Sequence, residues 1–215
     1  MREVQQYEIG SYKNFVYLIL DWAQKKAAII DPQFNLSKPL GDLKEKGFTL
    51  TAVLLTHTHF DHIAGLAGLL EAFPQLPLYV HPADLHRIKA DTVKRSKLIP
   101  IQDQDIIQIG DLSVHALHTP GHSPGEVCYF LKETNPPALF TGDTVFIRDC
   151  GRTDLEGGNN AQMFHSLQRI KQLPPQTVIL PGHHYQSETS SLLGDELLRS
   201  PPFQCKSVDE LANLP

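Results

Sequence analysis

The chain has 215 residues, of which 41% are hydrophobic and 20% are charged, and its formal net charge at pH 7 is -5. This composition is typical of a globular protein, and we expect a single domain over residues 1–215. The acidic balance argues against a broad phosphate-binding surface, so we expect no nucleic-acid partner.

The cysteines and the N-terminal sequence indicate the cellular compartment of the protein. Three cysteines without a repeated spacing predict neither a disulfide framework nor a thiolate zinc site. Residues 1–14 lack the apolar core of a signal peptide. No apolar run approaches the roughly 20 residues that a membrane helix needs. We therefore expect a soluble cytoplasmic protein, a monomer or homodimer, without a membrane partner.

The first half of the chain alternates between predicted strands and helices. Short runs rich in β-branched and aromatic residues predict strands, and apolar residues at helical spacing predict helices. Ser37 is placed to cap the first helix and Gly47 to end it. The predicted strands are 14–20, 26–32, 51–56 and 76–82, and the predicted helices are 37–47, 61–73 and 83–96.

The second half is richer in strands. We expect helices over 160–173 and 189–200, the latter ended by Pro201 and Pro202. The mixed βα and ββ order predicts two sheets with helices outside them. The predicted strands of this half are 105–110, 112–120, 126–132, 138–143 and 177–183.

Histidine and aspartate side chains gather just after the ends of predicted strands. The stretch THTHFDHIAG at 56–65 follows an apolar strand, and further candidates follow three later strands. Loops at strand ends are where a rigid scaffold positions functional side chains. The candidate metal ligands are His57, His59, Asp61, His62, His122, Asp143 and His183.

The spacing of the first cluster suggests two metal ions. His57 and His59 point the same way on an extended segment, because side chains alternate with period two. Asp61 and His62 follow at the first turn of a helix and can face a second ion. Imidazole suits zinc, iron and similar metals, and a carboxylate can bridge two cations. Seven ligands exceed the four of an ordinary zinc site, so two metals sharing one aspartate fit best.

The motifs THTHFDH, HTPGHSPG, FTGD and PGH, with the Asp31–Pro32 turn, resemble the metallo-β-lactamase superfamily. The resemblance implies an α+β fold of the αββα sandwich type, with two mixed sheets flanked by helices and the metals at the sheet edges. It also implies an assignment of the ligands. His57, His59 and His122 form one site, Asp61, His62 and His183 form the other, and Asp143 bridges them.

Two such metals would lower the pKa of a bridging water and supply hydroxide at neutral pH. They would also stabilise the oxyanion that forms on an attacked carbonyl. Thioesters suit this chemistry because a thiolate leaves readily, the pKa of a free thiol being about 8.5. Asp61 is expected to orient the hydroxide and so to act as a catalytic residue. The chain holds no GxSxG motif that would indicate a serine nucleophile.

The segment DCGRTDLEGGNNAQMFHSL at 149–167 resembles the glyoxalase II and persulfide dioxygenase group, whose members act on glutathione conjugates. Within that group, IRDCGRTD at 147–154 resembles the persulfide dioxygenases, whereas EGGNNAQMFHSLQRI and PGHHY resemble the hydrolases. The resemblance implies that Arg152 binds a glutathione carboxylate with its bidentate fork. It also implies that Tyr185 contacts glutathione. The alternatives are a surface ion pair for Arg152 and a packing role for Tyr185. Cys150 is expected to be a buried small residue at a tight turn.

The leading hypothesis is a glyoxalase II-like thioester hydrolase with two divalent metals, zinc first and iron or manganese as alternatives. A persulfide dioxygenase with one Fe(II) at His57, His122 and Asp143 is the alternative. A non-catalytic metal-binding module, a β-lactamase and a nuclease are less favoured. Glyoxalase II carries a helical C-terminal domain that completes its glutathione site, whereas 30 residues follow PGHHY here. Full specificity for lactoylglutathione is therefore not expected.

Overall fold

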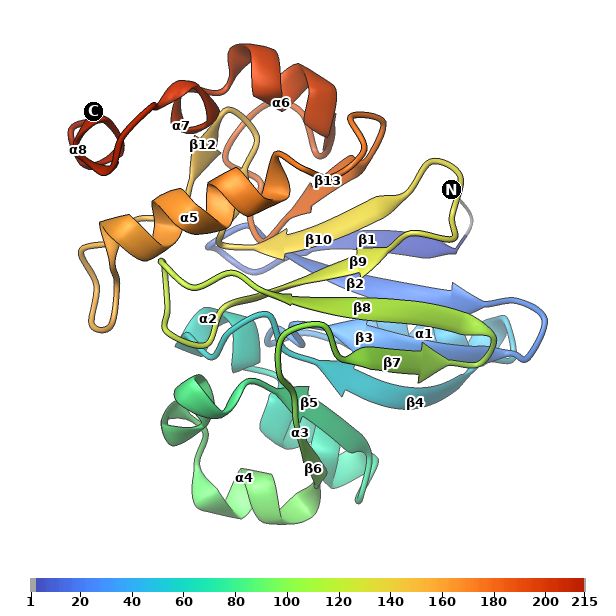
Figure 1. Ribbon diagram of the computed structural model, residues 1–215. Coiled ribbons are helices and arrows are strands. Elements are labelled where there is room, and N and C mark those ends of the chain that lie inside the picture. Colours follow the sequence, from blue (N-terminus) through green and yellow to red (C-terminus); the bar gives the residue numbers. More distant parts are fainter. Residues whose placement is uncertain (1–2, 215) are drawn as a thin grey trace.

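The computed structural model describes residues 3–214, which form two six-stranded sheets packed against each other, with helices on the outer faces (Figure 1). Both sheets are mixed, because each contains parallel and antiparallel neighbours. In spatial order the first sheet holds β1 (Val4–Ile9), β2 (Asn14–Asp21), β3 (Lys26–Ile30), β4 (Thr49–Leu54), β5 (Pro77–Val80) and β6 (Lys97–Pro100). The second holds β14 (Ser191–Leu192), β13 (Val178–Pro181), β10 (Ala138–Gly142), β9 (Val127–Leu131), β8 (Leu112–His118) and β7 (Ile106–Ile109).

Helices cover the outer face of each sheet. A short hairpin, β11 (Val145–Phe146) and β12 (Asp149–Cys150), follows β10. The first sheet is covered by α1 (Ser37–Glu45), α2 (Phe60–Ile63), α3 (Leu66–Ala72), the 3-10 helix η1 (Pro82–Arg87) and α4 (Ala90–Arg95). The second is covered by α5 (Asn160–Ile170), α6 (Leu193–Arg199), α7 (Pro201–Gln204) and α8 (Val208–Ala212). Among the described residues, no helix is long and apolar enough to cross a membrane.

Three hydrophobic clusters separate these four layers. One lies between the sheets and draws side chains from both. The others lie between each sheet and its helices. β2 is buried along its whole length, because alternate side chains enter two different clusters, with Ile19 facing the second sheet and Leu18 facing the helices. The predicted αββα sandwich is confirmed.

Two predicted helices are each divided in the structure. The predicted helix 61–73 begins at Phe60 and breaks at Gly65, where the chain touches the loop after β3. The amide of Gly65 donates to the carbonyl of Pro32 at 2.9 Å, and a Cβ at Gly65 would lie 2.2 Å from the carbonyl oxygen of Gln33. The predicted helix 83–96 is η1 and α4, separated by extended backbone at Ile88, which turns its side chain into the core.

The other differences lie at chain ends, edges and caps. The edge strands β1 and β6 have no continuous apolar run, and the sequence analysis missed them. The predicted helix 189–200 begins only at Leu193, after strand β14. Pro201 starts α7, where proline is tolerated in the first turn, rather than only ending α6. Leu36, not Ser37, precedes α1 as its cap, whereas Gly47 follows it with φ 71° as predicted.

Two buried tyrosines, one in each sheet, each form a hydrogen bond to a strand end of the opposite sheet. Tyr129 of β9 donates its hydroxyl to the carbonyl of Leu55, just past the end of β4, at 2.8 Å. Tyr17 of β2 donates to the carbonyl of Pro181, the last residue of β13, at 2.6 Å. Leu55 and Pro181 directly precede two of the loops that carry candidate ligands. The two hydroxyls therefore hold these loops at a defined position across the sandwich.

We expect Tyr129→Phe to lower the free energy of unfolding by about 1–3 kcal/mol, because the buried carbonyl of Leu55 loses its side-chain donor. Urea denaturation at pH 7 measures the change. Tyr79→Phe is the matched control, since no hydrogen bond of the Tyr79 hydroxyl is found among residues 3–214 and its ring is half-buried. Equal losses in the two variants would contradict the role of the Tyr129 hydroxyl.

Candidate metal centre

The seven candidate ligands converge at one edge of the sandwich. His57 and His59 lie on the loop after β4, and Asp61 and His62 lie in α2. His122 lies between β8 and β9, whereas Asp143 follows β10 and His183 follows β13. β10 and β13 are parallel neighbours, so their ends deliver Asp143 and His183 to the same edge. The short turn of α2 places Asp61 and His62 beyond the histidines of the loop, as predicted.

The ligand atoms form two groups that match the expected sites. One nitrogen each from His57, His59 and His122 lies within 4.8 Å of the others. The same holds for ligand atoms of Asp61, His62 and His183. A third group of this kind joins Asp31 to His57 and His62.

Asp143 lies between the two groups. Its Oδ2 atom is 3.4 Å from Nε2 of His122 and 3.4 Å from Nε2 of His183. Its Oδ1 atom is 3.3 Å from Nε2 of His62. One carboxylate therefore contacts both groups, which is the arrangement that a bridging ligand requires.

The unpaired atoms at the centre are those that a metal would use. Nε2 of His57 and Oδ1 of Asp143 are buried, and within the described part of the chain neither has a hydrogen-bond partner. Two pairs of ring nitrogens face each other, His59 Nδ1 with His122 Nε2 at 2.9 Å and His62 Nε2 with His183 Nε2 at 3.1 Å. Facing imidazole nitrogens need a proton or a cation between them. The donor set therefore fits divalent metal ions.

The opposite nitrogens of three ligand rings are bonded to the scaffold. Nδ1 of His122 lies 2.8 Å from the carbonyl of Arg152, and Nδ1 of His183 lies 2.8 Å from the carbonyl of Tyr12. Nδ1 of His62 is 3.0 Å from Oδ2 of Asp31. These contacts place the proton on the outer nitrogen and turn the lone pair toward the centre, as in metal-ligating histidines generally.

The protonation states favour cation binding. Partial burial and the neighbouring His122 ring lower the pKa of His59 to about 4, and burial together with His62 lowers the pKa of His57. Both rings are therefore neutral at pH 7, as ligands must be. Burial opposes the charged form of His62, but Asp143 and Asp31 outweigh it and raise its pKa. A cation that binds there takes over the role of that proton.

Two glycines allow the backbone to approach Asp143 closely. A Cβ at Gly182 would lie 2.4 Å from Oδ1 of Asp143, and one at Gly151 would lie 1.8 Å from its carbonyl oxygen. Neither approach leaves room for a side chain. The PGH and CGR motifs thus hold glycine next to the carboxylate that joins the two groups.

Three further polar residues support the ligands, and the sequence analysis assigned none of them this role. Asn14 donates Nδ2 to Oδ2 of Asp61 at 3.0 Å. Asp31, noted only as part of a turn, accepts from the backbone amide and hydroxyl of Thr56 at 2.8 and 2.6 Å. Glu126 accepts from the amide of Asp143 at 2.9 Å and lies 3.4 Å from Nδ1 of His57. A carboxylate at the head of the apolar run VCYFL is the one signal that points to Glu126.

Glu126 is fully buried, and burial followed by the nearby Asp143 raises its pKa well above the usual range. The residue fixes the His57 ring and the Asp143 backbone together.

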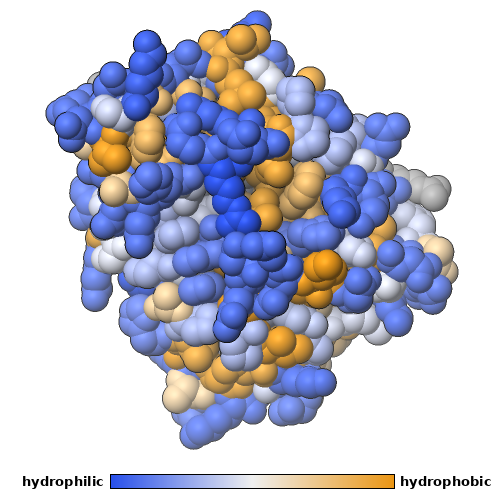
Figure 2. All heavy atoms as spheres, in the orientation of Figure 1, coloured by the Kyte–Doolittle hydropathy of each residue, from blue (hydrophilic) through white to orange (hydrophobic). Residues whose placement is uncertain are grey.

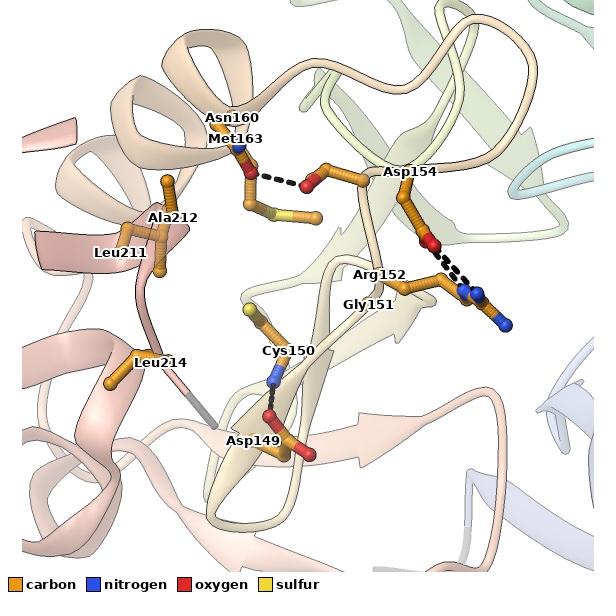
Figure 3. A pocket seen from close by; sticks show the side chains of 11 residues that line it. Asp149, Cys150, Gly151, Arg152, Asp154, Asn160, Met163, Leu211, Ala212 and Leu214 are labelled. Carbon is orange, nitrogen blue, oxygen red and sulfur yellow. Dashed lines mark hydrogen bonds and ion pairs between the residues drawn. The ribbon is translucent and has the colours of Figure 1, made fainter. Parts of the chain in front are cut away.

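The predicted substrate residues lie at the edge of the centre. Arg152 forms a two-point ion pair with Asp154, Nε to Oδ1 at 2.6 Å and Nη2 to Oδ2 at 2.7 Å. Figure 3 shows its side chain directed toward Asp154 and away from Cys150 and Met163, in a cavity of about 340 Å³. The alternative of a surface ion pair thus describes Arg152 in this structure.

Tyr185 is 56% exposed and stacks on His183, with ring centroids 4.7 Å apart. Burial and the Asp143 charge raise the pKa of its phenol to about 12, so it is a hydrogen-bond donor at pH 7. Cys150 lies in the hairpin strand β12 and is partly buried, rather than fully buried at a tight turn as the sequence predicted. Partial burial raises the pKa of its thiol to about 12, which makes it a poor nucleophile.

We expect Glu126→Ala to weaken metal binding ten- to a hundredfold, because residues that orient ligands typically contribute this much. Glu126→Gln should retain most of the affinity, since an amide oxygen can still accept from the amide of Asp143. Competition with a chromophoric chelator measures both constants. Equal affinities of the alanine variant and the unmodified protein would contradict the positioning role of Glu126.

Comparison with known proteins gives relatives in sequence and in fold. A protein of Bacillus velezensis named "probable polyketide biosynthesis zinc-dependent hydrolase BaeB" is 32% identical over 203 residues, which cover 94% of this chain and 87% of that protein. The hydroxyacylglutathione hydrolase of a Synechococcus species is 38% identical over 176 residues, 80% of this chain and 65% of that protein. The chain thus spans less than two thirds of the cyanobacterial relative's length.

The crystal structure of ETHE1 from Myxococcus xanthus matches 99% of this chain and 92% of its own, with a TM-score of 0.82 and 30% identity. The sequence profile described as the metallo-beta-lactamase superfamily matches residues 11–183, a range that contains all seven candidate ligands. The resemblance drawn from the motifs is confirmed. This chain belongs to the metallo-β-lactamase superfamily.

Proposed function

We propose that this protein is a metal-dependent thioester hydrolase that holds two divalent cations and acts on glutathione thioesters. The observation that carries the proposal is the position of Asp143, whose carboxylate contacts ligand atoms of both groups. All seven positions hold a residue type that binds metal, as a catalytic centre requires and a relict site would not. The names of the two relatives, a zinc-dependent hydrolase and a hydroxyacylglutathione hydrolase, support this direction.

Divalent cations at these residues would lower the pKa of a bound water toward neutrality and polarise a carbonyl oxygen. His57, His59 and His122 would hold one cation, and Asp61, His62 and His183 would hold the other. Asp143 would be a ligand of both. The side chains of the protein would orient the water, accept its proton and position the substrate.

The chain leaves one side of the centre open. His59 and Asp61 are half-buried, whereas the other five candidate ligands are buried. Asp61 is fixed by Asn14 through the 3.0 Å hydrogen bond to Oδ2. Its carboxylate is thus placed to orient a nucleophilic water and to accept its proton. A substrate therefore reaches the centre past His59, Asp61 and the exposed Phe60 between them.

Thioesters suit a site of this kind. The expelled thiolate has a conjugate acid of pKa about 8.5, so its departure needs little help from a general acid. An alkoxide or an amine is a poorer leaving group than a thiolate and would need a general acid to protonate it. Amides and simple esters are therefore poorer candidates.

Glutathione is the proposed thiol because Arg152 and Tyr185 lie beside the centre. The backbone carbonyl of Arg152 already positions His122, and Tyr185 covers His183. The ion pair of Arg152 with Asp154 is exposed, and exposed ion pairs are weak. A substrate carboxylate can therefore exchange with Asp154 on the guanidinium.

A mononuclear-iron persulfide dioxygenase is the second candidate. Its ligands would be His57, His122 and Asp143, and the IRDCGRTD segment together with the likeness to ETHE1 favours it. This candidate does not use Asp61, which separates it from the hydrolase.

The deciding experiment compares Asp61→Ala with Asp143→Ala. Asp143→Ala should abolish metal binding and activity in both cases, because each candidate centre uses that carboxylate. For a dinuclear hydrolase, Asp61→Ala should reduce the metal content from about two equivalents to about one and lower kcat at least a hundredfold, in the range of general-base catalysis. Elemental analysis and hydrolysis of lactoylglutathione measure these outcomes.

Wild-type protein with about one iron equivalent, whose oxygen uptake with glutathione persulfide survives Asp61→Ala, would establish the second candidate instead. Chelator treatment should abolish either activity, and added metal should restore it. Full activity of Asp143→Ala with full metal content would overturn both.

Arg152→Ala should raise the KM for a glutathione thioester about tenfold, because a carboxylate loses its bidentate partner. The KM for an N-acetylcysteamine thioester, which has no carboxylate, should not change. Arg95→Ala, which removes another exposed arginine of an ion pair, is the control. Steady-state kinetics with the two thiols measures the difference, and an unchanged KM for glutathione would argue for another thiol.

A further inference from the structure

An apolar groove of about 600 Å³ opens directly beside the candidate metal centre. His59 and Thr58 form its inner end, so the groove and the centre share a wall. The groove runs between the α2–α3 segment and the stretch from η1 to α4. In Figure 2 hydrophobic residues gather on the area between the places where Figure 1 shows α3 and α4.

One wall is a stripe of apolar side chains from α2, α3 and the turn between them. Phe60 and Ile63 of α2, Ala64 of the turn after it and Ala67 of α3 all line the groove on this side. Leu66 and Ile88 are buried beneath them as the floor. The small side chains of Ala64 and Ala67 are exposed and leave the groove open. This stripe has no function in the metal centre itself.

The polar members of the lining are already occupied or turned outward. The Thr58 hydroxyl donates to the carbonyl of Asp84 at 2.8 Å. Arg87 is held by Oδ1 of Asp84 at 3.2 Å and by the carbonyl of Glu156 at 2.9 Å. Lys89 is exposed, so its aliphatic stem lines the wall while its charge faces water. The groove therefore offers carbon surface rather than unsatisfied hydrogen-bonding groups.

Phe60, which lines the groove, contacts the aromatic ring of Tyr12, which lies outside the lining. Tyr12 and Phe60 are 53% and 67% exposed, and their rings meet edge to face with centroids 5.4 Å apart. The backbone of Tyr12 accepts from His183, so the pair connects the groove to the other metal group as well. Two large exposed rings at the mouth of a site indicate contact with an apolar ligand.

We propose that this groove binds the acyl chain of the substrate, and that the protein prefers thioesters of extended, apolar acyl groups to those of small hydroxy acids. The inference rests on the proposed thioester hydrolysis. It places the scissile carbonyl at the centre and the acyl chain along Ala64 and Ala67. A short polar acyl group would leave most of a groove of about 600 Å³ unfilled.

The test uses acetyl, butyryl and octanoyl thioesters of N-acetylcysteamine, a small uncharged thiol, with the metal-loaded protein. Each methylene that leaves water is worth about a fourfold gain in affinity, and an open groove captures part of it. We expect kcat/KM for octanoyl to exceed that for acetyl at least about tenfold.

Ala67→Trp should fill the groove and bring the octanoyl-to-acetyl ratio of kcat/KM close to one, because the octanoyl chain loses the surface on which its advantage depends. Gly68→Trp is the matched control, since Gly68 lies in the same helix, does not line the groove and has open space around it. An octanoyl-to-acetyl ratio of kcat/KM near one in the unmodified protein would overturn the inference while leaving thioester hydrolysis in place. A ratio that Ala67→Trp does not change would have the same consequence.

Binding separates the inference from the proposed function. Titration calorimetry compares S-octyl- and S-methyl-N-acetylcysteamine, which cannot be hydrolysed. Tighter binding of the octyl compound, lost in Ala67→Trp and kept in Gly68→Trp, would support the groove even if no thioester were hydrolysed. Equal binding of the two compounds by the unmodified protein would overturn the inference whatever the activity.

Discussion

The cost of burying negative charge governs this structure. Asp31, Asp143 and Glu126 are buried close together, and Asp61 lies at their edge. Carboxylates in such a place must either lose their charge or meet a positive one. Burial raises the pKa of Glu126, whereas Asp143 and Asp31 raise the pKa of His62. Burial lowers the pKa values of His57 and His59, which favours their neutral forms. The arrangement is therefore a receptor for cations, and the fold around it serves to hold mutually repelling groups in place.

The sandwich meets this demand by using the ends of strands from both sheets. A site drawn from one sheet would carry ligands on adjacent strands only. Here β4 supplies the loop of His57 and His59, and β10 and β13 supply Asp143 and His183 from the other side. The hydroxyls of Tyr17 and Tyr129 cross the interface to the strand ends involved. The distance between the sheets thereby sets the distance between the ligands.

The sequence predicted the parts of this architecture whose signals are local. His57, His59, Asp61 and His62 lie within six positions, and each remaining ligand follows an apolar strand, so all seven could be placed by strand ends and spacing. Their roles at the metals remain predictions. Asn14 and Glu126 were missed because their partners come from distant segments. The break at Gly65 depends on the carbonyls of Pro32 and Gln33, which no helical pattern reveals. The ion pair of Arg152 is local, but only side-chain geometry shows that Asp154 occupies its fork.

The close packing around Asp143 implies that some positions near the site tolerate substitution and others do not. Backbone and carboxylate atoms surround Gly151 and Gly182 so tightly that no other residue type fits there. A side chain at either position would displace Asp143 from the two ligand groups. Ala64 and Ala67 are exposed to solvent, so larger side chains are not excluded there by close packing. The α2–α3 segment can therefore change its side chains without disturbing the centre, and with them the shape of the groove that it lines.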